Sequence, residues 1–214
     1  FSGATNEDGF SSSSTVAFMP SDRGEFLANY TWREQGLQED GNGNIIGNSN
    51  FELPSFLIKG GLYFGDDNEH RLRASFSQTE TTERDKPYDS FGTTAGFFGN
   101  VDRDTLSKVA TLGYDYDPVD NDLIDVEILL SYADQQIEQR NALGTPNALL
   151  DADHRYETTK LTAKNNAWFD TGGIRHNLRA GIELAWKERA DASSAPGGID
   201  RRFAVFAVDE MALT

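Results

Sequence analysis

The residues best suited to bind a ligand lie in long polar stretches between apolar segments. Arg84, Lys86 and Tyr88 fall in the longest of these stretches, residues 79–105. Guanidinium and ammonium groups attract anions, and a phenol can donate a hydrogen bond or ligate a metal. A basic cluster is a local exception in a chain with 35 Asp and Glu against 19 Lys and Arg. We interpret the three residues as a candidate anion site; the alternative is ordinary solvated loop charge.

A histidine adds a second kind of ligand group. His154 ends another polar stretch, residues 137–154, and a neutral imidazole can donate, accept or bind haem iron. The competing interpretation is a solvated loop histidine, because no second ligand accompanies it. His70 and His176 each follow a short turn instead. We include His154 among the candidate ligand-binding residues and predict no resident metal site.

Motifs for catalysis are missing from the sequence. It has no cysteine, no HExxH and no nucleophile elbow, which excludes thiolate chemistry and two common hydrolase arrangements. The aspartates at 115, 117, 120 and 122 lack the glycine and closing glutamate of a calcium-binding loop. We therefore predict a protein that is not an enzyme and needs no cofactor.

The overall charge restricts the partners. A formal net charge of -16 repels nucleic-acid phosphates, so we exclude nucleic acid. The 214 residues suffice for one ordinary domain, and 14 Phe, 7 Tyr and 3 Trp favour a folded chain over a solvated coil. No apolar run approaches the ~18 residues of a spanning helix.

Alternation of apolar and polar residues is the strongest structural signal. In residues 123–133, apolar side chains occupy every second position from Ile124 to Tyr132, with Glu127 among the polar residues between them. Such alternation gives a β-strand one apolar and one polar face. The same pattern recurs at 26–33, 56–64, 71–77, 110–116, 160–169 and 177–186, and less clearly at 203–213. We therefore predict about eight strands.

The connections between these strands alternate in length. Short turns occur at 65–68, 117–122 and 170–173, and long polar stretches at 35–50, 79–105, 137–154 and 190–201. Every second connection of an antiparallel sheet lies at the same end, so one end carries turns and the other loops. Outer-membrane barrels show this asymmetry. We predict an all-β fold: an irregular lead-in at 1–23 and, at 24–214, a segment of an antiparallel up-and-down transmembrane β-barrel.

Two further features favour lipid on the apolar side. The polar face carries charges of both signs, including Lys59, Arg71 and Glu127, and aromatic residues such as Trp32 and Trp186 lie near strand ends. A soluble, lipocalin-like barrel with an apolar interior is the alternative.

Two regions carry a resemblance to a known family. Residues 25–33, followed by 43–49 and 57–59, and residues 176–183, followed by 206–210, resemble barrel strands of TonB-dependent outer-membrane receptors. The spacing around 25–76 slightly favours the haem/haemoglobin-type branch. That branch carries FRAP-like and NPNL-like boxes, and neither occurs here. Receptors of this family have a plug domain and about 22 strands, so the resemblance implies an internal piece of a longer polypeptide.

The resemblance also implies a function. It predicts a receptor in the bacterial outer membrane that takes up an iron chelate or haem, energised by a periplasmic TonB-type protein through a plug not present here. Outer-membrane lipid would then be a partner, and Arg84, Lys86, Tyr88 and His154 would face the cargo from extracellular loops. The alternatives are a small eight-stranded structural barrel and a soluble ligand-binding barrel.

Overall fold

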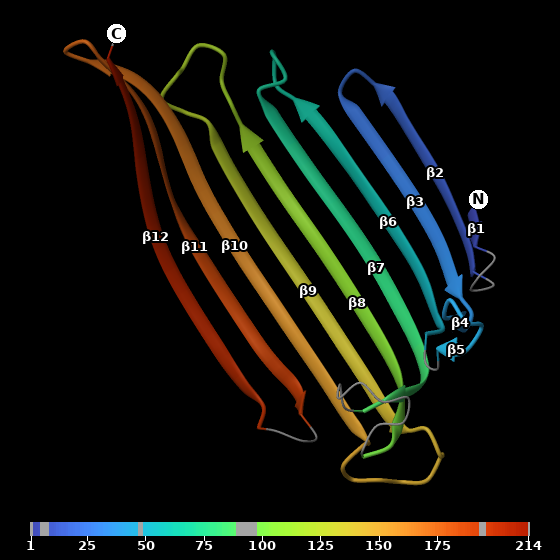
Figure 1. The fold of residues 1–214 in the computed structure, drawn as a ribbon. Helices are drawn as coiled ribbons and strands as arrows, with labels where there is room; N and C mark the ends of the chain where they lie inside the picture. The colour runs from blue at the N-terminus through green and yellow to red at the C-terminus, as the bar shows by residue number, and fades with distance from the viewer. Residues whose placement is uncertain (1, 5–8, 47–48, 89–97, 193–195, 214) are drawn as a thin grey trace.

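The computed structural model describes residues 2–4, 9–46, 49–88, 98–192 and 196–213, and all regular structure in them is β (Figure 1). Within these ranges no helix has the length and apolar character needed to span a bilayer. The strands are β1 (Ser2–Ala4), β2 (Gly9–Ser21), β3 (Gly24–Gln35), β4 (Gln38–Glu39), β5 (Ile45–Ile46), β6 (Phe51–Phe64), β7 (His70–Pro87), β8 (Asn100–Tyr116), β9 (Val126–Asn141), β10 (Ala152–Thr171), β11 (Ile174–Ala192) and β12 (Gly198–Leu213).

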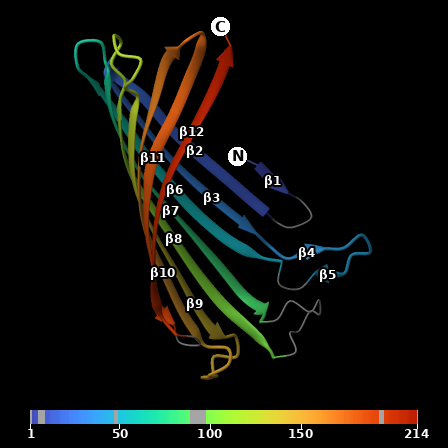
Figure 2. The same cartoon turned by 90° about the vertical axis from the view of Figure 1, so that its left-hand side faces the viewer.

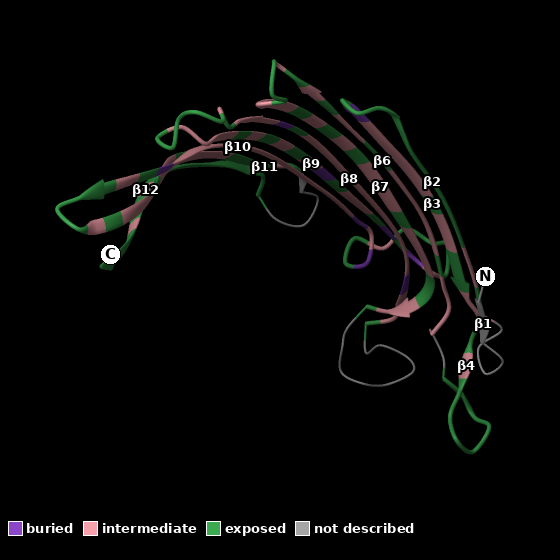
Figure 3. Cartoon of the chain, turned by 90° about the horizontal axis from the view of Figure 1, so that it is seen from above, coloured by how far each residue is buried: buried purple, intermediate pink, exposed green. Residues whose placement is uncertain are grey.

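Ten of these strands form a single antiparallel sheet in which each strand pairs with its neighbours along the chain. Seen from above, the sheet bends into an arch (Figure 3). The order runs from β1 to β12, and in the described residues these two edges do not pair, so the barrel is not closed. The predicted all-β, up-and-down antiparallel architecture is confirmed. The remaining two strands, β4 and β5, form a small hairpin that projects beyond the sheet (Figure 2).

The strands extend further than their apolar patterns indicate. All eight predicted strands are present, as β3 and β6 to β12, but β2 occupies part of the predicted irregular lead-in. Its run of four serines, Ser11 to Ser14, hides the alternation. On the face shared with β3, Ser13 bonds to Thr31 at 3.0 Å and Asn29 donates to Thr15 at 2.8 Å. Polar side chains therefore take the place of apolar contacts in this pair.

The predicted long loops are correspondingly shorter. Strands occupy the ends of each predicted stretch: β7 runs to Pro87 and β8 begins at Asn100, β9 runs to Asn141 and β10 begins at Ala152, and β11 runs to Ala192 and β12 begins at Gly198. Backbone pairing continues where both faces are polar because strand hydrogen bonds need no apolar side chain. The strict alternation of connection lengths also fails, since the turn-end connection 117–125 is longer than the separation in sequence between the end of β11 at Ala192 and the start of β12 at Gly198. The two-residue turn between β10 and β11 has both Gly172 and Gly173 at positive φ, 56° and 84°, which a type I′ hairpin requires.

The strand register gathers the apolar residues on one face. One row of directly opposed residues crosses seven strands and is apolar or aromatic throughout: Leu62, Leu72, Tyr114, Ile128, Ala163, Ile182 and Val205. We call this row and its apolar neighbours on the same face the apolar belt. On β11 the belt extends from Leu178 to Trp186, about 27 Å along a strand. A strand tilt of roughly 40° reduces this to about 20 Å, comparable to the band of a membrane barrel.

The apolar belt lies on the convex side of the arch. On β7, Leu72 and Phe76 are exposed, whereas Arg71 and Arg73 are half-buried. Curvature separates side chains on the convex face and crowds them on the concave face, which accounts for this difference. Only Val101, Leu150, Ala152 and Ala167 are buried apolar residues in the described part of the chain. The fold thus turns its apolar residues outward, opposite to a lipocalin-like barrel with an apolar interior.

Candidate ligand-binding site

The concave face is a polar wall in which charges of opposite sign pair across neighbouring strands. Lys164 of β10 lies directly opposite Glu127 of β9, and their charged atoms are 3.2 Å apart. Lys160 of β10 reaches Glu183 of β11 at 2.7 Å. Cross-strand neighbours on one face are close enough for such pairs. The wall is therefore hydrophilic, and several of its charges are balanced by a partner on the neighbouring strand.

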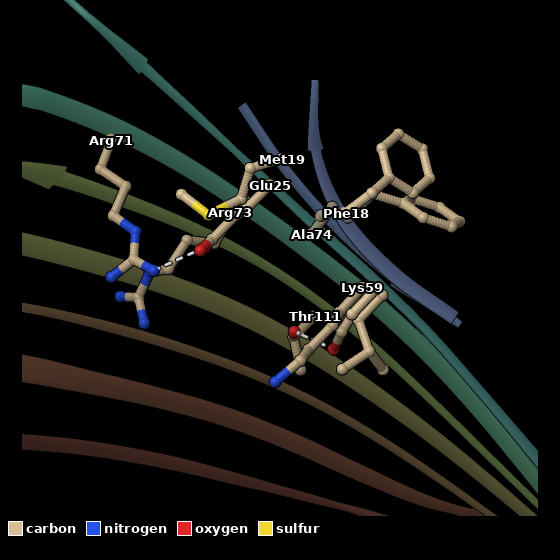
Figure 4. A pocket seen from close by; sticks show the side chains of 13 residues that line it. Phe18, Met19, Glu25, Lys59, Arg71, Arg73, Ala74 and Thr111 are labelled. Carbon is tan, nitrogen blue, oxygen red and sulfur yellow. Dashed lines mark hydrogen bonds and ion pairs between the residues drawn. The ribbon is translucent and has the colours of Figure 1, made fainter. Parts of the chain in front are cut away.

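A cavity of about 760 Å³ opens in this wall near the tight-turn end, between β2 and β8 (Figure 4). Arg71 donates to Glu25 at 2.7 Å, and Arg73 donates to Asp115 at 2.6 Å. Lys59 points into the same space, on the other side of the sheet from the ring of Phe18 (Figure 4). The cavity therefore combines paired charges with small and apolar residues.

A glycine makes room for one of these ion pairs. A Cβ at Gly61 would lie 2.6 Å from Oε1 of Glu25, so a larger residue would displace the carboxylate from Arg71. The Nε atoms of Arg71 and Arg73 are both buried without a hydrogen-bond partner. These two donors are therefore enclosed by protein atoms and left without a partner.

The structure does not bring the predicted basic cluster together. Arg84 forms a bidentate ion pair with Asp104, at 2.8 and 3.2 Å. A β-bulge between Glu83 and Lys86 shifts the register, with Asp85 at a φ of 55°, so Lys86 lies opposite Val101 on the concave side. Lys86 donates to the carbonyl oxygen of Asn50 at 2.7 Å. The two cations therefore leave β7 on different faces.

Tyr88 lies just beyond β7 and contacts another aromatic residue. Its ring meets Phe98 edge-on at 6.3 Å, and its backbone N–H donates to Gly99 at 3.0 Å. Binding of cargo by Arg84, Lys86 and Tyr88 stays a prediction.

His154 belongs to strand β10, where a loop position was expected. Its Nδ1 lies 3.0 Å from an Nη atom of Arg189, on the neighbouring strand β11. Tyr156 occupies the same face, two residues along. Sequence reasoning missed Arg189 because it sits at the end of an alternating strand, where no motif marks it. Only the β10–β11 register reveals that it meets His154 and Tyr156.

The loop 142–151 folds back onto the strand ends beside this region. Leu150 is 2% exposed, and its carbonyl oxygen accepts a hydrogen bond from Gln139 at 2.8 Å. The carboxylate of Asp151 accepts the backbone N–H groups of Asn147 and Asn141, at 2.9 and 2.8 Å. These bonds lower the pKa of Asp151 below its ordinary value near 3.8.

This pKa makes the loop sensitive to acid. The depressed pKa stabilises the folded loop above about pH 4, and that stabilisation is lost as the pH falls through the folded-state value. We expect the amides of Asn141 and Asn147 to be protected from hydrogen exchange at pH 6 and to lose protection progressively as the pH is lowered below the ordinary aspartate range. Asp151→Ala should lose it already at pH 6. Equal protection in the variant at pH 6 would contradict this assignment.

The described residues were also compared with the requirements of a metal site. Across the described ranges, no three His, Asp or Glu side chains converge on a point where they would hold a metal ion.

Comparison with known proteins shows which solved structures share this fold. No family model and no curated protein matches the sequence. Among solved structures, the Serratia marcescens hemophore receptor HasR, solved with its hemophore HasA and heme, aligns with a TM-score of 0.79 and 22% identity, covering 97% of this chain and 30% of HasR. The siderophore receptor PiuA from Acinetobacter baumannii aligns with a TM-score of 0.67 and 12% identity, covering 99% of this chain and 39% of PiuA. The FrpB iron transporter from Neisseria meningitidis aligns with a TM-score of 0.66 and 15% identity, covering 86% of this chain and 30% of FrpB.

These likenesses define the class of fold. The expected resemblance to TonB-dependent outer-membrane receptors is confirmed at the level of the barrel fold. The chain spans about a third of the length of the receptors it matches. These neighbours are named as a hemophore receptor, an iron transporter and a siderophore receptor.

Proposed function

We propose that this chain forms part of the barrel wall of a bacterial outer-membrane receptor that takes up an iron chelate or haem. The observation that carries the proposal is the division of one curved sheet into a convex apolar belt and a concave, ion-paired polar wall. Water on the concave side and lipid on the convex side satisfy both faces at once. The receptors with the same fold are named for heme, iron and siderophores, which supports an iron-bearing cargo.

The transport step follows from the same proposal. The barrel wall would guide the cargo inward, and a periplasmic TonB-type protein would supply the energy through a plug domain. Arg84, Lys86, Tyr88 and His154 would contact the cargo near the loop end.

The test uses the native polypeptide that contains this chain, extracted from outer membranes in detergent. We expect it to migrate faster on a gel before boiling than after, as folded membrane barrels do. It should also bind at least one of three anionic iron complexes: haemin, ferric citrate or a ferric tris-catecholate. Bacteria lacking the protein should take up the bound complex more slowly. A protein found in the soluble fraction, or one that binds none of the three, would contradict the proposal.

A further inference from the structure

Four side chains gather on the concave face where β10 and β11 approach their long-loop ends. They are His154, Tyr156, Lys187 and Arg189, and we call them the Tyr156–Arg189 cluster. Tyr156 lies directly opposite Arg189, and Lys187 lies opposite Thr158 on the same face. His154 lies on the same face of β10, two residues before Tyr156, and its Nδ1 is 3.0 Å from an Nη atom of Arg189. The cluster is separate from the turn-end cavity and from Arg84.

The ring of Tyr156 organises the two cations. The guanidinium carbon of Arg189 lies 5.5 Å from the ring centroid, and Nζ of Lys187 lies 5.8 Å from it. Both distances fall within the range of cation–π attraction. Two positive groups of β11 therefore lie beside the ring of Tyr156.

The hydrogen bond between Arg189 and His154 determines which nitrogen of the imidazole carries the proton. A guanidinium has only donors, so Nδ1 of His154 accepts from Arg189 at 3.0 Å and the ring proton resides on Nε2. His154 thus presents an N–H group in this arrangement. An iron-ligating role through Nε2 would require that proton to leave.

The cluster contains donors without a balancing carboxylate. In the described part of the chain, neither Lys187 nor Arg189 forms an ion pair. Lys160, two residues beyond Thr158 on β10, does form one, with Glu183. The carboxylate in register with Lys187, Asp200, instead binds Arg202 at 2.7 Å. On β9, the residues opposite Tyr156 and His154 are the neutral Gln135 and Ile137. Nε of Arg189 is buried and has no partner.

We propose that the Tyr156–Arg189 cluster is an anion-binding subsite that receives the negatively charged periphery of the iron complex. Two cations flank the Tyr156 ring and an imidazole lies beside one of them, and in the described part of this chain of net charge -16 neither cation has a carboxylate partner. An incoming carboxylate or phenolate oxygen would supply the charge-assisted partner that these two cations lack among the described residues. The inference rests on the proposed function, because it assumes that the cargo is an anionic iron complex.

The experiment compares matched arginine variants of the native polypeptide in detergent. Arg189→Gln removes the charge from the cluster, and Arg140→Gln removes one at the same end of the sheet, where Arg140 is paired with Asp153 at 2.6 Å. Each is titrated with haemin, ferric citrate and a ferric tris-catecholate. For the complex that the wild type binds, we expect Arg189→Gln to weaken binding about tenfold and Arg140→Gln to leave it unchanged. Arg189→Lys should lie between wild type and Arg189→Gln.

Heat-shifted gel mobility checks that each variant is folded. Salt provides a second readout, because added salt should weaken wild-type binding more than binding by Arg189→Gln. If the wild type binds a complex and folded Arg189→Gln binds it equally well, the subsite is wrong and the proposed function stands. If the wild type binds none of the three complexes, the proposed function fails and the subsite fails with it.

Discussion

Ile128→Arg is expected to stop the chain from assembling in a membrane. Ile128 lies in the row of apolar residues that crosses seven strands, opposite Tyr114 and Ala163, and 38% of it is exposed on the convex face. An arginine near the middle of the lipid band costs about 2–4 kcal/mol. The folded fraction is measured by heat-shifted mobility after refolding into lipid vesicles.

The neighbouring residue supplies the control. Leu129 points to the concave wall, opposite Gly113 and Thr162, so Leu129→Arg places the same charge one residue away on the wet face. We expect Leu129→Arg to assemble far better than Ile128→Arg. Equal assembly of the two variants would mean that the convex face does not meet lipid.

Gly181→Val is expected to disrupt the pairing of β10 with β11. A Cβ at residue 181 would lie 2.5 Å from the carbonyl oxygen of Ala163 and 3.0 Å from Cα of Lys164. Cζ of Phe206 would lie 2.8 Å away as well. A side chain can move aside, but the two backbone atoms can move only if the strands themselves separate. Overpacking of this kind costs about 1–3 kcal/mol. The midpoint of urea unfolding in detergent micelles, followed by tryptophan fluorescence, measures the loss.

Gly198 offers a matched substitution. A Cβ there meets no atom within 4 Å, because the residue opens β12 at the edge of the sheet. We expect Gly198→Val to unfold at the wild-type urea concentration. A midpoint for Gly181→Val equal to that of Gly198→Val would rule out a close approach of the two strands at residue 181.

The sequence alone predicted the features that depend on one strand at a time. The alternation around Ile128 or Leu184 places successive side chains on opposite faces whatever the neighbouring strand, so eight strands and their apolar face could be found. β2 was not predicted, because the serines at positions 11–14 make both faces of its first half polar. The loop lengths were wrong where strands continue beyond the apolar belt, since pairing there depends on the partner strand.

The candidate site was harder to predict because it depends on register. Arg84 and Lys86 are two residues apart, which in a regular strand places them on one face, but the bulge at Asp85 separates them. His154 and Arg189 are far apart in the sequence and meet only through the β10–β11 pairing. No spacing rule in a single sequence specifies either arrangement.

Pairing of each strand with its sequence neighbours makes the sheet modular. A hairpin starts and finishes at the same end of the sheet. If β8 and β9 were removed together, the last residue of β7 and the first residue of β10 would lie at the same end of the sheet, where a single loop could join them. Removing one strand would reverse the direction of every strand after it. Proteins built on this plan can therefore change circumference by duplication or loss of whole hairpins, and evolution is expected to vary their strand number in steps of two.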